Sequence, residues 1–316
     1  MGLLDHRLLI VGGKGGVGRS VVSAALASLA AERGKRVLLV GVDCADRTGA
    51  LLEAGVVGPE PRRVRPGLDA VNLEPLHVAR DFIELHLPMR SLARQVSSSA
   101  VFRYWFEATP MLRELMLLGK VWHLATQAPP GASEPSYDLL VVESPATGHG
   151  LGFLQASENA ACLLVGPMRK KADAMNAFLR DSAQTRMVIV TLAEEMPVNE
   201  ACELAVRCEQ ELGIALGPMV VNAVFEGQLS DPSAPLTSAA ELQAGGLDAG
   251  LAARAAEALE YVEGRGREAQ RQRAELARRF SGSALELPWV DAVTFGSSEV
   301  DALARVLARQ LEGVAL

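Results

Sequence analysis

Short apolar runs alternate with stretches of helical periodicity along most of the chain. The runs lie at 7–12, 36–42, 70–73, 138–142, 161–165, 187–191, 218–222 and 284–287. Continuous apolar runs of this length are typical of strands that are covered by helices on both faces, as in a parallel sheet. The pattern therefore predicts an α/β protein with a mostly parallel β-sheet flanked by helices.

Helical periodicity fills the intervals between these runs. Helices are expected from the end of the glycine-rich loop that follows the first run to about Arg33, and at 77–86, 89–97, 99–107, 110–126, 168–182, 197–212, 249–281 and 298–313. Because strands resume after residue 126, the block 77–126 reads as a helical insertion within one domain that spans residues 1–316. The segment 226–249 is rich in Gly, Ser, Pro and Ala, which predicts a loop.

Composition narrows the class of protein. The net charge of −7 argues against broad electrostatic binding to nucleic acid. No apolar run is long enough for an integral membrane segment, and the first strand begins too early for a signal peptide, so a cytoplasmic location is expected. The cysteines Cys44, Cys162, Cys202 and Cys208 form no C-x-x-C pair, which favours reduced, buried thiols over a zinc site.

The first apolar run is followed by a glycine-rich loop that predicts nucleotide binding. Residues 13–20 read Gly-Lys-Gly-Gly-Val-Gly-Arg-Ser, close to the phosphate-loop pattern G-x-x-x-x-G-K-[ST]. Backbone N–H groups of such a loop bind phosphate oxygens at the start of a helix. The residues expected to bind ATP or ADP are Gly13, Lys14, Gly15, Gly16, Val17, Gly18, Arg19, Ser20 and Val21.

Four residues of this site concern the metal ion and the phosphate charge. Ser20 occupies the place of the hydroxyl that ligates Mg²⁺, and Glu143 ends a buried strand where a metal-coordinating or water-orienting carboxylate belongs. Arg19 replaces the lysine that normally contacts the β- and γ-phosphates. Arginine keeps the charge but is longer and planar. The chain has only five lysines, and Lys14 lies inside the loop itself.

The loop and a second segment resemble a known family. The letters K-G-G-V-G-R-S from Lys14 onwards resemble the deviant phosphate loop K-G-G-V-G-K-[ST] of MinD, ParA, nitrogenase iron protein and the ArsA-type ATPases. Residues 143–149 resemble the D-T-A-P-T-G-H switch of the ArsA type, with Glu143 in place of the aspartate. Over nearly its full length the chain resembles an ArsA/Get-type ATPase, a family that includes the arsenite-pump ATPase and the targeting factor for tail-anchored membrane proteins.

The resemblance implies a P-loop NTPase fold and a dimer with nucleotide at its interface. In that family Lys14 would reach the phosphates of the opposite subunit, and Asp43 would orient the attacking water, although an acid after a strand also serves as a helix cap. Asn222 would read the adenine and Pro288 would lie in the adenine-side loop, although asparagine at a strand end is also a common turn residue. The cysteine sets that bind arsenite or zinc in the family have no counterpart here.

The departures at Arg19 and Glu143 leave the activity open. Weakened or altered hydrolysis with retained binding is one interpretation, and drift in an arginine-rich chain is the other; drift explains Glu143 less well. The chain is thus expected to be a dimeric, ATP-binding switch that requires Mg²⁺. An alternative is a non-hydrolysing regulatory partner in a heterodimer with a conventional paralogous ATPase, instead of a homodimer.

The helical block suggests a third function. Residues 89–124 carry more apolar side chains than a single helix face needs. These side chains either form a core with the sheet and with one another, or line a groove for a hydrophobic client protein, as the resemblance to targeting factors implies. The sequence favours core packing.

Overall fold

A computed structural model of the chain describes residues 2–43, 47–86, 99–128, 131–145, 147–225 and 238–312. Within these residues the apolar runs form one eight-stranded sheet in the order β3-β4-β2-β5-β1-β6-β7-β8. The strands are β1 (Leu8–Gly13), β2 (Val37–Val42), β3 (Arg62–Arg65), β4 (Leu68–Leu73), β5 (Leu139–Glu143), β6 (Thr185–Leu192), β7 (Leu216–Val224) and β8 (Ala284–Pro288). Only β3 is antiparallel to its neighbour, so the predicted mostly parallel sheet is confirmed.

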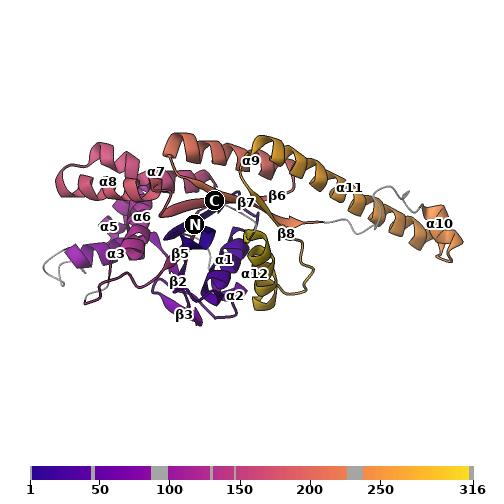
Figure 1. Cartoon of the computed structure of the whole chain (residues 1–316), viewed down its shortest axis with the longest axis horizontal. Helices are drawn as coiled ribbons and strands as arrows, with labels where there is room; N and C mark the ends of the chain where they lie inside the picture. The colour runs from indigo at the N-terminus through magenta and orange to yellow at the C-terminus, as the bar shows by residue number, and fades with distance from the viewer. Residues whose placement is uncertain are drawn as a thin grey trace.

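Helices cover both faces of the sheet (Figure 1). One face packs on α1 (Arg19–Glu32) and α12 (Ser297–Leu311), and the short helix α2 (Thr48–Leu51) lies beside them. The opposite face packs on α6 (Pro110–Thr126), α7 (Thr147–Leu163), α9 (Glu195–Val206) and the π-helical turn η2 (Arg207–Leu212). A 3₁₀ turn, η1 (Leu3–Asp5), precedes β1.

The alternating directions of side chains along the central strand β1 explain why the sheet has a hydrophobic core on each face. Leu8 and Ile10 of β1 belong to the core on the α6–α7 side, whereas Leu9 and Val11 belong to the core on the α1–α12 side. Successive side chains of a strand point to opposite faces, so a run of apolar residues supplies both cores at once. The central position of β1 therefore follows from a strand that is apolar at every residue.

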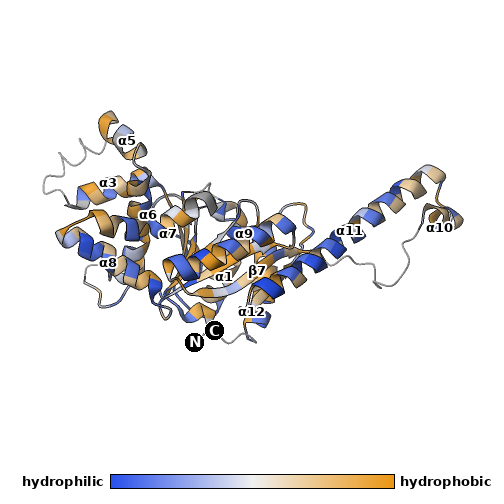
Figure 2. Ribbon diagram, turned by 90° about the horizontal axis from the view of Figure 1, so that it is seen from above, coloured by the Kyte–Doolittle hydropathy of each residue, from blue (hydrophilic) through white to orange (hydrophobic). Residues whose placement is uncertain are grey.

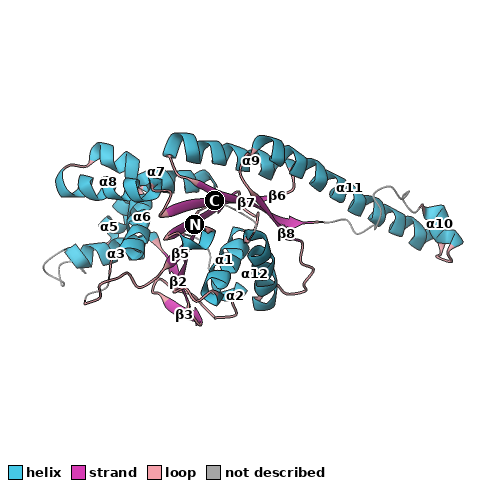
Figure 3. Cartoon of the chain, in the orientation of Figure 1, coloured by secondary structure: helices cyan, strands magenta, loops and turns pink. Residues whose placement is uncertain are grey.

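The helical block and a long helix lie at opposite ends of the sheet (Figure 3). The block contains α3 (Pro75–His86), α5 (Ala100–Glu107) and α6, and it packs with α7 and with α8 (Gly166–Arg180), which come later in the chain. At the other end α11 (Ala249–Arg279) extends away from the sheet and carries α10 (Ala239–Ala244) near its tip, and its surface is largely hydrophilic (Figure 2).

Several sequence predictions need correction. Residues 161–163 are the last turn of α7 rather than a strand, because Ala160 and Ala161 pack against Ala172 and Met175 of α8. Helix α7 was not predicted, because its apolar residues are spread around the helix instead of forming one stripe. The edge strand β3 was also missed, since three of its four residues are arginine.

The predicted loop at 226–249 is partly helical, because Ser238 and Glu241 form a reciprocal cap that starts α10. Residues 226–237 of that prediction, and the helix predicted at 89–97, lie outside the described residues. Cys202 and Cys208 are buried as expected, but Cys162 is exposed, and Cys44 lies outside the described residues. No helix in the described part of the chain is both long and apolar enough to cross a membrane.

Candidate nucleotide site

The glycine-rich loop connects the central strand to a buried helix. It leaves β1 at Gly13, which lies opposite Val190 of β6, and enters α1 at Arg19. Gly13 (φ 146°) and Gly18 (φ 93°) have positive φ, and a Cβ there would lie 2.3 Å from the Val190 carbonyl oxygen and 2.1 Å from Asn222 Nδ2, respectively. Both positions thus exclude a side chain on steric grounds.

The middle of the loop is open. Gly15 and Gly16 are exposed, and a Cβ on either would meet no atom within 4 Å. Val17 points into the core on the α1–α12 side. The backbone of the exposed part is therefore accessible to a ligand, and the start of α1 supplies the partial positive charge that favours an anion.

A hydroxyl and a carboxylate meet directly beneath this loop. Glu143 ends β5 with Val11 of β1 and Gly41 of β2 as its register partners, and the Ser20 hydroxyl donates a hydrogen bond of 2.8 Å to Glu143 Oε1. Both residues are buried. Two adjacent oxygen ligands of this kind suit Mg²⁺, which takes few protein ligands and keeps water and phosphate oxygens for the rest of its shell.

Burial dominates the electrostatics of Glu143. It raises the pKa of this carboxyl above its ordinary value, against the opposing effects of the Ser20 hydrogen bond and of the positive charges of Arg19 and Arg47. A carboxylate that is costly to ionise in the ligand-free protein gains most from a bound cation. The residues present therefore fit a Mg²⁺ ion.

Arg19 lies against the end of β5. Its guanidinium donates a hydrogen bond to the carbonyl oxygen of Ser144, directly after Glu143. The arginine is partly buried, and its charge opposes the effect of burial on the pKa of Glu143 without cancelling it. Arginine in place of lysine thus keeps a positive charge at the site, and the carbonyl oxygen of Ser144 holds it in place.

Lys14 and Asp43 face other partners. Lys14 Nζ forms an ion pair of 2.8 Å with Glu200 Oε1 on α9, and its side chain is 34% exposed. Asp43 follows β2 with a positive φ of 47°, and its Oδ2 lies 3.2 Å from a guanidinium nitrogen of Arg113 on α6. Both contacts are intramolecular, and the roles of Lys14 at a phosphate and of Asp43 at a water molecule remain predictions.

On the other side of the loop, Asn222 braces the phosphate loop. Its side-chain amide donates a hydrogen bond of 2.9 Å to the carbonyl oxygen of Val17, and the residue is buried. The pairing of β7 with β8 shifts register between Val221 and Val224, and Ala223 has a positive φ of 51° within that bulge. Bulges re-aim side chains at strand ends. A contact of Asn222 with adenine remains a prediction.

A cavity of about 390 Å³ lies beyond the carboxyl ends of β6, β7 and β8. Its walls include Leu192 and Ala223 of the sheet, Trp289 directly after Pro288, and Tyr261 and Arg265 of α11. The sequence predicted an adenine-side loop at Pro288, which is exposed, but it did not predict a contribution from the side chains of α11. The chain has only three tyrosines and three tryptophans, so Tyr261 and Trp289 were the available signal.

These residues define a class of protein. Gly13, Ser20, Glu143 and Asn222 meet at the carboxyl edge of a parallel sheet, where α/β proteins bind their ligands. Residues 147–149, which belong to the segment that resembles a switch, begin α7. A glycine-rich loop between a central strand and a helix, with a hydroxyl–carboxylate pair beneath it, is the site of a P-loop NTPase.

Comparison with known proteins identifies the family. The model of the anion-transporting ATPase family matches residues 6–172, more than half of the chain. The chain therefore belongs to this family of ArsA-like P-loop ATPases, as the loop and switch motifs predicted.

Named relatives agree with this assignment. ATPase BagA of Mycobacterium tuberculosis is 28% identical over 251 residues, which cover 78% of this chain and 73% of the relative. The arsenical pump-driving ATPase of Acidiphilium multivorum is 29% identical over 238 residues, which cover 67% of this chain but only 38% of that protein. ATPase ASNA1 homolog 1 of Paramecium tetraurelia is 25% identical over 147 residues, 46% of this chain and 42% of the relative.

Proposed function

We propose that the protein is a dimeric, nucleotide-driven switch that binds ATP with Mg²⁺ and hydrolyses it slowly. The observation that carries this proposal is the buried Ser20–Glu143 pair directly beneath an open, amide-lined loop. The loop amides would hold the phosphates, the pair would hold Mg²⁺, and the cavity beside Trp289 would receive the base. Mg²⁺ would neutralise charge on the β- and γ-phosphates.

We expect hydrolysis to be slow because the side chains assigned to the γ-phosphate are held by other partners in the structure. Water would attack the γ-phosphorus in line while the bond to the leaving ADP oxygen breaks, with Asp43 orienting the water and Arg19 and Lys14 stabilising charge. In the described structure Asp43 pairs with Arg113, Lys14 pairs with Glu200, and Arg19 binds the Ser144 carbonyl. Rearrangement of these contacts on nucleotide binding is the switch that we propose.

Calorimetric titration and steady-state turnover test this proposal together. ATP is expected to bind with a clear dependence on Mg²⁺, and Arg19→Lys is expected to raise turnover, because lysine places a compact charge on the phosphates. Binding without turnover in both proteins would favour the alternative of a non-hydrolysing regulatory partner, which is then tested by mixing with a paralogous ATPase. Absence of Mg²⁺-dependent binding would refute both.

The apolar cavity of the helical block favours a second function, the binding of a hydrophobic client segment. The cavity measures about 280 Å³ and lies between α3, α6 and α8, with Phe82, Met116, Trp122, Met168 and Met175 among its walls. Methionine side chains adapt to varied apolar partners. The Asp43–Arg113 pair joins the nucleotide site to α6, which forms one wall of this cavity.

A photo-crosslinking assay with a hydrophobic helical peptide tests this second function. Crosslinking is expected with the native chain and is expected to be lost in Met116→Asp, while Met196→Asp, an exposed methionine on α9, serves as the matched control. Equal crosslinking in all three proteins would show that the cavity is not the peptide site.

A further inference from the structure

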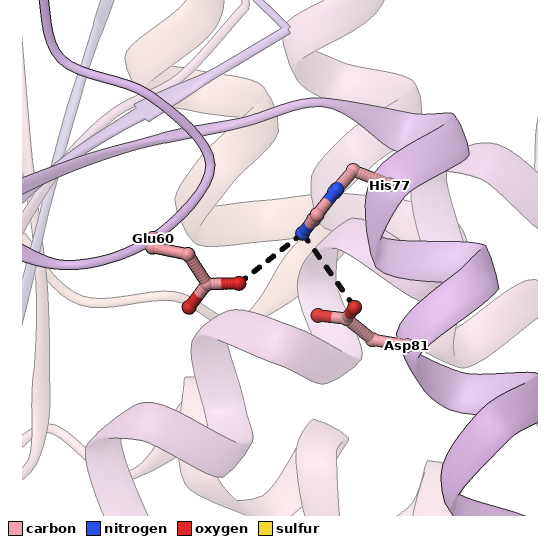
Figure 4. Close-up of side chains that lie close together, drawn as sticks. All are labelled: Glu60, His77 and Asp81. Carbon is pink, nitrogen blue, oxygen red and sulfur yellow. Dashed lines mark hydrogen bonds and ion pairs between the residues drawn. The ribbon is translucent and has the colours of Figure 1, made fainter.

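Three potential metal ligands converge near the start of α3 (Figure 4). His77 and Asp81 lie four residues apart on α3, so both project from the same face of the helix. Glu60 comes from the segment between α2 and β3. The three ligand atoms lie within 4.8 Å of one another.

Both carboxylates approach the same ring nitrogen. His77 Nε2 lies 3.3 Å from Glu60 Oε1 and 3.5 Å from Asp81 Oδ1. These separations are longer than the 2.7–3.2 Å usual for a hydrogen bond from nitrogen to oxygen. A single Nε2 proton also cannot serve two carboxylates fully. Hydrogen bonding alone therefore accounts poorly for the arrangement.

The same separations match the edges of a metal coordination shell. Zinc lies about 2.0–2.2 Å from nitrogen and carboxylate oxygen ligands, so neighbouring ligands of a tetrahedral site are about 3.3–3.6 Å apart. The two measured edges, 3.3 Å and 3.5 Å, lie in this range. One imidazole and two carboxylates suit Zn²⁺ and similar transition metals, whereas Mg²⁺ and Ca²⁺ prefer oxygen alone.

We propose that Glu60, His77 and Asp81 form a binding site for one divalent transition-metal ion of the Zn²⁺ class. The three side chains leave one tetrahedral position for water. Their exposed fractions of 76%, 32% and 39% give an ion access from solvent.

Lys120 completes the arrangement from α6. Its Nζ lies 3.2 Å from Asp81 Oδ2, which leaves Oδ1 directed at His77. A partner that holds the second oxygen of a ligating carboxylate fixes the orientation of the first. The lysine also offsets part of the charge of the two carboxylates in the metal-free protein.

The site has a structural consequence for the helical block. A bound ion would join α3 to the segment that precedes β3, and would add to the contact that His77 and Glu60 already make between them. Asp81 also lines the apolar cavity between α3 and α6. Metal binding would therefore hold one wall of this cavity in place.

Titration with Zn²⁺ and with Co²⁺ tests the proposal on the metal-free full-length protein. One equivalent of Zn²⁺ is expected to bind, and Co²⁺ is expected to give the visible absorption of a four-coordinate site. His77→Gln and Asp81→Asn are each expected to weaken this equivalent at least tenfold. His123→Gln, on α6 and outside the cluster, is the matched control and is expected to bind as the native chain does.

Two results would overturn the proposal: binding no tighter than about 0.1 mM, or an affinity that His77→Gln leaves unchanged. In either case the cluster is only an ion pair between His77 and its two acids. ATP binding is measured on the same proteins and is expected to be unaltered. Failure at this site is thereby distinguished from failure of the proposed nucleotide function and from misfolding of a variant.

Discussion

The inner and outer halves of the proposed nucleotide site differ in how far they are assembled. The inner half, Ser20 and Glu143, is buried and joined by a hydrogen bond of 2.8 Å. The outer half, Lys14 and Asp43, is at least one third exposed, and each side chain pairs with a residue of another helix. The same loop and strand ends thus carry two residues that contact each other and two that form ion pairs with more distant helices.

This difference separates binding from turnover. A preformed, desolvated pair contributes to affinity without rearrangement, whereas charged groups in exposed ion pairs are exchanged at small cost, about 0–1 kcal/mol. The inner half is therefore expected to determine nucleotide affinity, and the outer half to determine the rate of hydrolysis. The first variant below tests the loop that lies between the two halves, and the others act on one half at a time.

The largest effect is expected from Gly18→Ala. The new Cβ would lie 2.1 Å from Asn222 Nδ2 and displace the amide that braces Val17. With the backbone strain at φ 93°, the loss of unfolding free energy should be about 2–4 kcal/mol. Gly16→Ala is the matched control, with φ 91° but no atom within 4 Å, and should lose about 1–2 kcal/mol. Urea denaturation of the ligand-free proteins measures both, and equal losses would show that Asn222 does not support the loop.

Ser20→Ala removes the hydroxyl of the inner half. Mg²⁺–ATP affinity should fall about 10–100-fold, as expected for the loss of a polar contact to a charged group, while ATP binding without Mg²⁺ changes little. Ser23→Ala, one turn further along α1, removes a buried hydroxyl without a hydrogen-bond partner in the described structure and should leave affinity unchanged. Calorimetry compares the two. Similar losses in both variants would place the metal elsewhere.

Glu143 predicts a pH dependence of stability. Burial raises the pKa of this carboxyl in the folded protein above its ordinary value of 4.5. The folded state then holds the proton more tightly than the unfolded chain, so the stabilising contribution is present below pH 4.5 and is lost as the pH rises through the raised value.

Glu143→Gln stays neutral and should gain stability relative to the native chain as the pH rises through this window, while its Mg²⁺ dependence of ATP binding disappears. Thermal melts across the acidic and neutral range measure the first effect, and calorimetry measures the second. A stability difference that is constant with pH would mean that the carboxyl is not desolvated.

The smallest effect is expected in the outer half. Glu200→Gln releases Lys14 from its ion pair and should raise ATP turnover up to about fivefold, the equivalent of at most about 1 kcal/mol. Glu203→Gln, also exposed on α9, should have no effect. Steady-state phosphate release compares them. A decrease in Glu200→Gln would show that the ion pair supports the active arrangement instead of competing with it.

The sequence predicted the sheet and the inner half because both depend on local pattern. Strand-like runs preceded the loop and Glu143, and the carboxyl ends of parallel strands must share one edge of the sheet. The spacing from Gly13 to Ser20 then placed the hydroxyl. These predictions needed no knowledge of distant contacts.

Other features depended on tertiary packing. Helix α7 has no apolar stripe because α6, α8 and the sheet surround it, so periodicity gave no sign of it. Asn222 is turned towards the back of the loop by a bulge that has no signature in the letters around it. The partners of Lys14 and Asp43 lie 186 and 70 positions away along the chain, on helices whose placement the sequence did not fix.

Turnover per protomer, measured over a range of protein concentrations, tests most directly whether one chain suffices to bind nucleotide while two are needed to hydrolyse it. ATP affinity should be independent of protein concentration, because the inner half lies within one chain. Turnover per protomer should rise with concentration and should be lost in Lys14→Ala at every concentration. A turnover that is constant with concentration and unchanged in Lys14→Ala would contradict the account.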